Sequence, residues 1–161
     1  MPMEIRELKT EIEIREAIAL ANRSFRKFIA PEYSRRGQRT FSKFVRFKSE
    51  QYIVEINKGE KKMWGCYIKG SLAAMMATRN VTHLCLLFVD EPYMGMGLGG
   101  AMVKFLIAEL RPVTNKITVN ASPYALKIYA HMGFYPDGPK IDRGGIVCYP
   151  MALNICVSPP F

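Results

Sequence analysis

Hydrophobic residues change their spacing along the chain, and the changes predict a mixed α/β fold. Almost every residue from His83 to Val89 is apolar, which is typical of a central strand buried on both faces. After a short polar connection, apolar residues recur at helical spacing from Leu98 until Pro112 stops the pattern. The segment Thr82–Leu110 therefore predicts a strand, a loop and a helix in succession.

Further elements are predicted on both sides of this segment. Thr10 and Glu13 form a capping box at the start of an amphipathic helix. Ser122 and Pro123 favour the start of a later helix, which Gly133 ends. The buried stripe expected on this later helix comprises Ala125, Ile128, Tyr129 and Met132. The remaining strands are expected at Met3–Leu8, Met63–Ile68, Ser71–Thr78, Lys116–Val119, Phe134–Tyr135 and Ile146–Ile155, with an exposed loop at Pro136–Gly145.

Four glycines, Gly95, Gly97, Gly99 and Gly100, lie between the central strand and its helix. Glycine lets backbone N–H groups approach a ligand closely, and a helix N-terminus favours an anion such as phosphate. The spacing also satisfies the dinucleotide fingerprint G-x-G-x-x-G. That fingerprint requires a glycine directly after the first strand and an acidic residue at the end of the second strand. Here the second predicted strand is followed by Asn120 instead of an acidic residue. The loop therefore indicates a phosphate-bearing ligand other than a dinucleotide.

Length and composition fit one globular domain, residues 1–161. With 49% apolar residues the chain is too hydrophobic to be disordered. No apolar run reaches about 18 residues, so neither a transmembrane helix nor membrane attachment is expected. The charged N-terminus does not resemble a signal peptide. The four cysteines lack metal-ligand spacing, so no metal site is expected, and a reduced, cytoplasmic protein is the simplest interpretation.

The net charge of +9 suits an anionic partner, either a phosphate-bearing coenzyme or nucleic acid. Basic residues are concentrated in the segment Arg35–Lys48, where aromatic residues are interleaved with them. The aromatic residues share one face of a predicted helix, so they are assigned to packing rather than to base stacking. That face comprises Phe41, Phe44, Val45 and Tyr52. We therefore expect a solvated basic helix and no specific binding of nucleic acid.

Two blocks of sequence point to one family. The first is the glycine loop, in which residues 94–99 read M-G-M-G-L-G. The second is Ile117–Phe134, in which A-x-x-x-Y-x-x-x-G-F begins at Ala125. Together they resemble the GCN5-related N-acetyltransferases (GNAT superfamily), whose signatures are Q/R-x-x-G-x-G/A and N-x-x-A-x-x-x-Y-x-x-x-G-F. Met94 and Ser122 depart from the first position of each signature, and the resemblance extends over residues 68–151.

The resemblance implies a GNAT fold of the α/β (α+β) class. Its mixed, mostly antiparallel, twisted sheet splays at the cofactor site and is flanked by about four helices. Acetyl-CoA is implied as cosubstrate, with its pyrophosphate on the glycine loop and its pantetheine arm along the central strand. The residues implied to contact it are Leu87, Phe88, Val89, Met94, Gly95, Met96, Gly97, Leu98, Gly99, Gly100, Asn120, Ser122 and Tyr129. In the family, the region that corresponds to Arg35–Lys48 lines the acceptor pocket. The resemblance therefore implies a second interpretation of this segment, as a wall of the acceptor pocket.

The reaction implied by the resemblance is transfer of the acetyl group to a primary amine by direct attack. Tyr129 occupies the motif position whose phenol protonates the departing thiolate, and a pKa of about 10 suits that task. His83 is the candidate base, because a pKa near ~6.5 suits proton abstraction at neutral pH, provided that the strand register turns it toward the cleft.

Two functions therefore remain open. The first is an acetyltransferase that acts on an unidentified small-molecule, peptide or protein amine, and the retention of Tyr129 favours it. The alternative is a catalytically silent GNAT-fold module that senses acyl-CoA or binds nucleic acid. Either function is compatible with a homodimer.

Overall fold

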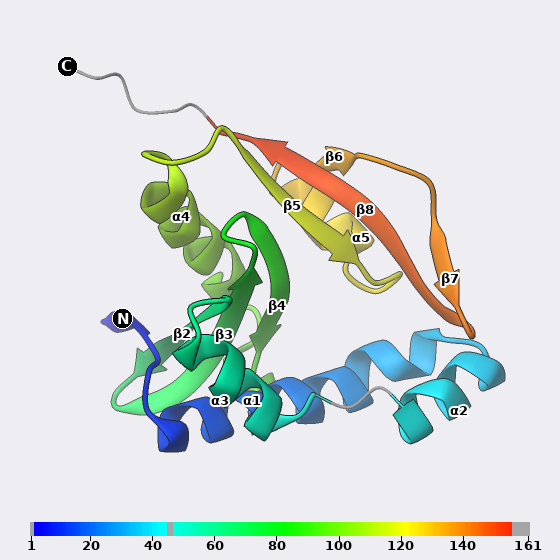
Figure 1. Ribbon diagram of the computed structural model, residues 1–161, viewed down its shortest axis with the longest axis horizontal. Coiled ribbons are helices and arrows are strands. Elements are labelled where there is room, and N and C mark those ends of the chain that lie inside the picture. Colours follow the sequence, from blue (N-terminus) through cyan, green and yellow to red (C-terminus); the bar gives the residue numbers. More distant parts are fainter. Residues whose placement is uncertain (1, 45–46, 156–161) are drawn as a thin grey trace.

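The computed structural model describes residues 2–44 and 47–155, and for residues 41–44 it describes the backbone alone. Eight strands form a sheet in the order β1-β2-β3-β4-β5-β8-β6, with β7 paired to β8 (Figure 1). The strands are β1 Met3–Glu7, β2 Lys61–Ile68, β3 Ser71–Arg79, β4 His83–Val89, β5 Lys116–Ala121, β6 Tyr135–Pro136, β7 Ile141–Arg143 and β8 Ile146–Asn154. The α-helices are α1 Glu11–Ser24, α2 Arg35–Phe44, α3 Ser49–Asn57, α4 Leu98–Leu110 and α5 Leu126–His131.

The predicted mixed, mostly antiparallel sheet is confirmed. Paired neighbours run antiparallel except β4 and β5, which are parallel. Five α-helices flank the sheet, one more than the sequence suggested, because α2 and α3 are separate helices. The expected loop Pro136–Gly145 also contains a short strand, β7.

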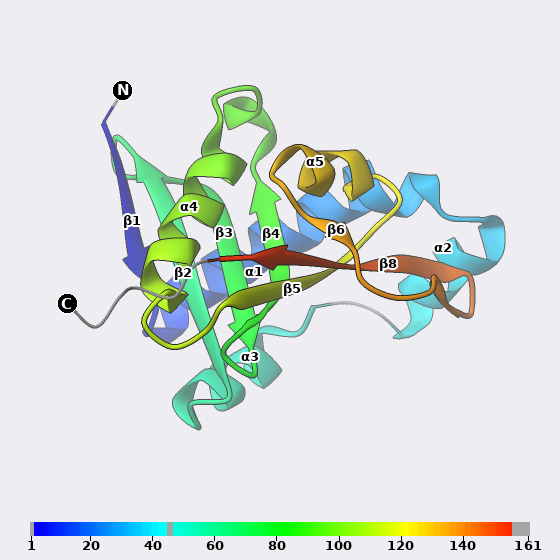
Figure 2. The ribbon, with the colours of Figure 1, turned by 90° about the horizontal axis from the view of Figure 1, so that it is seen from above.

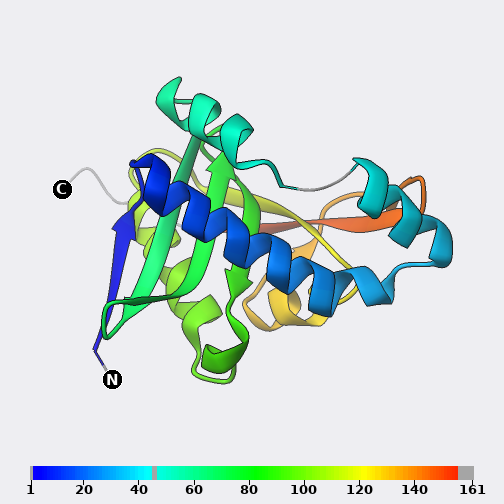
Figure 3. The same cartoon turned by 90° about the horizontal axis from the view of Figure 1, so that it is seen from below.

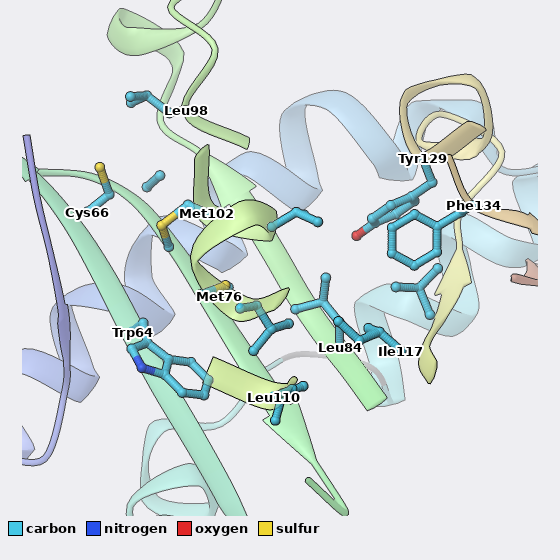
Figure 4. Packing of buried hydrophobic residues seen from close by; sticks show 14 of the residues in the cluster. Trp64, Cys66, Met76, Leu84, Leu98, Met102, Leu110, Ile117, Tyr129 and Phe134 are labelled. Carbon is cyan, nitrogen blue, oxygen red and sulfur yellow. The ribbon is translucent and has the colours of Figure 1, made fainter. Parts of the chain in front are cut away.

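Two hydrophobic cores lie on opposite faces of the sheet. Figure 3 shows α1 crossing one face, with α3 on the same side, and Figure 2 shows α4 on the opposite face. Successive side chains of a strand point to opposite faces, so the neighbours Met75 and Met76 of β3 belong to different cores. Met75 packs in the core that contains Ile18 of α1, whereas Met76 packs in the core that contains Met102 of α4 (Figure 4).

The sheet splays between β4 and β5, and a β-bulge lies where it opens. The two strands pair only at His83↔Thr118 and Leu84↔Val119. On the other edge of β4, Thr78 pairs with Leu84 and Ala77 with Leu86, which leaves Cys85 as the extra residue of a bulge. A bulge bends its strand and increases the local twist. We infer that this bend turns the second half of β4 away from β5, and Figure 2 shows β5 and β8 crossing in front of β4.

The prediction that β4 is buried on both faces is wrong for its second half. Leu84 and Leu86 are buried, whereas the last three residues, Leu87, Phe88 and Val89, are only half-buried. Beyond the bulge no strand of the described residues covers this edge of β4, so side chains that would pack in a continuous sheet face an opening instead.

The later helix starts at Leu126, three residues after the predicted start at Pro123. Ser122 accepts a hydrogen bond from the Ala125 amide at 3.2 Å, so it closes a turn rather than capping the helix directly. Ile128, expected in the buried stripe, is 43% exposed because α5 lies beside the opening rather than over a closed sheet.

The basic helix α2 contacts the β7–β8 hairpin. The Thr40 hydroxyl donates a hydrogen bond to the Gly144 carbonyl at 2.6 Å, and a Cβ on Gly37 would collide with the backbone of Gly145. The contact joins α2 to the β5–β8 wing of the sheet (Figure 1). The predicted packing of Phe41, Phe44 and Val45 concerns side chains that lie outside the described residues, whereas Tyr52 is buried as expected.

Val81, in the turn between β3 and β4, has a left-handed backbone with φ of 67° and is 60% exposed. A β-branched residue is strained there by about 1–2 kcal/mol, which glycine avoids at a smaller entropic cost. We expect Val81→Gly to raise the free energy of unfolding in urea by about 1 kcal/mol. The matched control is Val54→Gly at an exposed position of α3. This change should lower the free energy of unfolding by about 0.5–1 kcal/mol. Equal destabilisation by both changes would show that Val81 is not strained.

Candidate active site

A cavity of about 360 Å³ opens beside the end of β4, beyond the point where β4 and β5 stop pairing. Three parts of the chain line it: the end of α1 with the π-helix Phe25–Ile29 that continues it, the end of β4 with the glycine loop, and α5 with the turn before it. The lining residues are Ser24, Phe28, Ile29, Leu87, Phe88, Val89, Tyr93, Met94, Gly95, Gly97, Leu98, Gly99, Gly100, Tyr124, Ala125, Ile128, Tyr129 and Met132.

The glycine loop forms a cradle whose shape suits a phosphate. Gly95 and Gly97 have φ of 82° and 77°, a left-handed conformation that glycine adopts without strain. A Cβ built on Gly95, Gly97 or Gly100 would meet nothing within 4 Å, so open space lies in front of the backbone. Within the part of the chain that the structure describes, no side chain caps the N-terminus of α4. The first amides of α4 have no partner within the helix, and together with the helix dipole they can bind an anion.

Tyr129 brings a phenol into the same cavity. Its side chain is 8% exposed and stacks edge-to-face on Phe134, with 5.2 Å between the ring centroids. Figure 4 shows the ring beside Phe134 with its hydroxyl directed toward β4. Burial raises the pKa of this phenol, with a smaller contribution from Cys85. Tyr129 is therefore a protonated hydrogen-bond donor at physiological pH.

The end of α1 forms a wall of the cavity that the sequence did not indicate. Ser24, Phe28 and Ile29 belong to an ordinary amphipathic pattern, so no sequence signal distinguishes them from core residues. The Phe28 ring lies 6.2 Å from that of Tyr124, which joins this wall to the turn before α5.

Two ion pairs hold the end of α1 against the turn that precedes the glycine loop. The Arg23 guanidinium contacts both carboxylate oxygens of Asp90, at 3.2 and 3.1 Å. The Lys27 ammonium lies 2.7 Å from the Glu91 carboxylate. These contacts link the two walls of the cavity at the protein surface, and both carboxylates of the turn form ion pairs in them.

Most of the predicted cofactor residues line the cavity, and three do not. The ten predicted residues in the lining are Leu87, Phe88, Val89, Met94, Gly95, Gly97, Leu98, Gly99, Gly100 and Tyr129. Met96 belongs to the same loop but is exposed outside the lining. Asn120 is exposed near the end of β5, and Ser122 hydrogen-bonds within the turn before α5. The roles of all thirteen residues toward acetyl-CoA stay predictions.

His83 lies apart from the cavity. It is at the start of β4, where β4 still pairs with β5, and its Nδ1 is 2.8 Å from the Thr118 hydroxyl. At ~3.3 Å per residue, it is about 16 Å along the strand from Phe88. Burial, followed by the positive charge of Arg79, lowers the pKa of His83 to about 4. Its assignment as the base stays a prediction, and the structure does not bring it together with Tyr129.

The pKa of His83 makes stability depend on pH. Between its usual value of ~6.5 and about 4, the unfolded chain binds a proton at this residue and the folded chain does not. Stability should therefore fall as the pH drops from 6.5 to 4, by about 1 kcal/mol after allowance for solvent screening of a half-buried group. Urea unfolding between pH 7 and 4.5 should show a weaker pH dependence for His83→Gln than for the wild type. An unchanged pH dependence in His83→Gln would show that this residue does not titrate differently in the folded and the unfolded chain.

Comparisons with known proteins agree with this geometry. The profile of the family described as "Acetyltransferase (GNAT) domain" matches residues 29–155. A GCN5-related N-acetyltransferase from Rhodopseudomonas palustris has a TM-score of 0.73 at 18% identity, over 96% of this chain and 99% of that one. The PaiA N-acetyltransferase from Thermoplasma acidophilum, solved with coenzyme A, has a TM-score of 0.71 at 16% identity, over 96% and 99%. The ribosomal-protein-S18-alanine N-acetyltransferase from Escherichia coli has a TM-score of 0.71 at 17% identity, over 99% and 97%.

The chain belongs to the GNAT acetyltransferase family, and it has the GNAT fold that its sequence predicted. A search of curated proteins found no match. Within residues 2–44 and 47–155, no helix is long and apolar enough to span a membrane. The same part of the chain contains no group of three or more His, Cys, Asp or Glu side chains arranged to hold a metal ion.

Proposed function

We propose that the protein is an N-acetyltransferase that moves the acetyl group of acetyl-CoA to a primary amine by direct attack. One observation carries this proposal: the open glycine loop and the Tyr129 phenol belong to the same cavity in the splayed sheet. Family membership supports acetyl transfer in general, and the coenzyme A complex of the Thermoplasma neighbour supports the choice of cosubstrate.

The chain's own groups supply binding and proton donation. The amides of Gly95–Gly100 bind the pyrophosphate, and Leu87, Phe88 and Val89 offer an apolar strand edge to the pantetheine arm. Bound acetyl-CoA supplies the acetyl group as a thioester. Tyr129 donates a hydrogen bond to the sulfur as negative charge develops there. The pKa of a phenol, ~10, is already above the ~8.5 of a thiol, and burial raises the pKa of Tyr129 further. The phenol therefore acts chiefly through this hydrogen bond rather than by complete proton transfer.

Direct attack is favoured over an acetylated enzyme. No cysteine and no lysine is among the described residues that line the cavity, and Cys66 and Cys85 have thiol pKa values raised by burial. A raised pKa leaves little of the nucleophilic thiolate. Mass spectrometry after incubation with acetyl-CoA alone should therefore find no acetylated cysteine.

Release of coenzyme A tests the proposal. A thiol assay with a panel of amines, amino acids and peptides should show release that depends on both acetyl-CoA and an acceptor. Binding of acetyl-CoA without release for any acceptor would favour the silent acyl-CoA sensor. The nucleic-acid alternative rests on the exposed Arg35, Arg36 and Arg39 of α2. It would require a defined oligonucleotide to bind at physiological salt, with an affinity that falls steeply as salt rises.

A further inference from the structure

Ser24 has a buried hydroxyl without a partner. Its side chain is 4% exposed, and among the residues that the structure describes its Oγ is the one buried polar side-chain atom that makes no hydrogen bond. A serine inside a helix usually donates to the carbonyl four residues earlier. Here α1 changes into a π-helix directly after Ser24, and such turns are frequent at functional sites. Since Ser24 lines the cavity, a ligand there can provide the missing partner.

The cavity offers no counter-ion to a charged acceptor. The described lining residues include no Asp, Glu, His, Lys or Arg. In the turn beside the cavity, Asp90 forms an ion pair with Arg23, and Glu91 forms one with Lys27. An ammonium that enters such a site loses its hydration without compensation. A neutral amine keeps its lone pair and needs only a hydrogen-bond partner.

The net charge of the chain and the basic segment that follows α1 oppose the approach of cations. The segment that continues α1 into α2 carries four exposed arginines, in a protein with a net charge of +9. These arginines are Arg26, Arg35, Arg36 and Arg39. A field of this sign lowers the local concentration of polycations and raises that of anionic molecules. Both the outer charge and the inner lining therefore disfavour a strongly basic acceptor.

We infer that Ser24 is the hydrogen-bond partner of the acceptor amine and that the cavity takes this amine as the neutral free base. The acceptor class is then a weakly basic amine, such as the α-amino group of an amino acid or peptide, and not a polyamine or a lysine side chain. This inference rests on the proposed acetyltransferase function.

The reaction balances without a carboxylate base. The nitrogen lone pair of the neutral amine forms a bond to the thioester carbonyl carbon, and the C–S bond breaks with its electrons on sulfur. The nitrogen then loses one proton and the sulfur gains one, so the products are an amide and free coenzyme A. The Ser24 hydroxyl accepts a hydrogen bond from an amine N–H and directs the lone pair toward the carbonyl carbon. A strong base would be needed only to deprotonate an ammonium.

Two matched peptides test the acceptor class. One has a free α-amine and an acetylated lysine side chain, and the other has an acetylated α-amine and a free lysine. With pKa values of ~7.8 and ~10.4, their neutral fractions at pH 7.5 differ by about 10²-fold. We expect kcat/KM for the α-amine peptide to be higher by about that factor, with spermidine no better than the lysine peptide. Turnover of lysine or spermidine at least as fast as the α-amine overturns the inference and leaves the proposed function standing. No release with any amine overturns both.

Ser24→Ala tests the residue itself. Loss of the hydroxyl should lower kcat/KM for the α-amine peptide at least about tenfold, while calorimetry shows unchanged affinity for acetyl-CoA. Because the hydroxyl has no partner in the free protein, the melting temperature should stay the same or rise. Ser24→Thr keeps the hydroxyl and should retain more activity than the alanine variant. A lowered melting temperature with unchanged kinetics in Ser24→Ala would make Ser24 a structural residue and overturn its assignment.

Discussion

Gly97→Asp is expected to abolish the binding of acetyl-CoA while the fold is retained. Gly97 precedes α4 with φ of 77°, and open space lies where its Cβ would be. An aspartate there would place a side chain and a negative charge in the space proposed for the pyrophosphate. Both steric exclusion and charge repulsion then oppose binding. Isothermal titration calorimetry with acetyl-CoA should show no measurable binding, and Gly99→Asp should behave similarly.

The chain contains a closely matched control for this change. Gly59, in the turn before β2, also has φ of 77° and no atom within 4 Å of the position that a Cβ would take, but it lies away from the cavity. Gly59→Asp therefore introduces the same charge and the same backbone strain without approaching the ligand. It should lose stability to a similar extent and keep full affinity. Unchanged affinity in both Gly97→Asp and Gly99→Asp would show that the pyrophosphate binds elsewhere.

Tyr129→Phe is expected to lower kcat at least about tenfold with little change in affinity for acetyl-CoA. The substitution keeps the ring and its contact with Phe134 and removes only the hydroxyl. The lost hydrogen bond is stronger to the developing thiolate than to the resting thioester, so the loss falls on the transition state. General acid catalysis typically contributes ~10²–10⁴-fold, and a phenol that acts by hydrogen bonding belongs at the lower end of the effect.

Tyr52→Phe is the control for the loss of a buried phenol. Tyr52 is equally buried but belongs to the core under α1 and α3, away from the cavity, and burial also raises its pKa. This variant should keep kcat within about twofold. Full activity of Tyr129→Phe together with a lowered melting temperature would contradict the catalytic role and leave Tyr129 as a core residue.

The parts of the site that the sequence determined depend on local structure. A glycine loop between a strand and a helix forms its cradle from consecutive residues, so Gly95, Gly97 and Gly100 have the same role wherever the sheet lies. The helical spacing that buries Tyr129 is likewise local, as is the capping box of Thr10 and Glu13, which is present in the structure. Such features depend on hydrogen bonds between residues a few positions apart, so the sequence pattern predicts them directly.

Contacts between distant segments decided which other residues line the cavity. The bulge at Cys85 depends on the register of β4 against β3, which one apolar run does not specify. That register also sets which residues of β4 line the opening, and His83 lies on the paired half of the strand. Ser24 reaches the cavity because α1 crosses the sheet and two ion pairs hold its end beside the glycine loop. The sequence alone determined the glycine loop and the position of Tyr129 in its helix, and only the tertiary structure determined the wall of the cavity formed by the end of α1, because that wall is made of residues whose local pattern is that of an ordinary core helix.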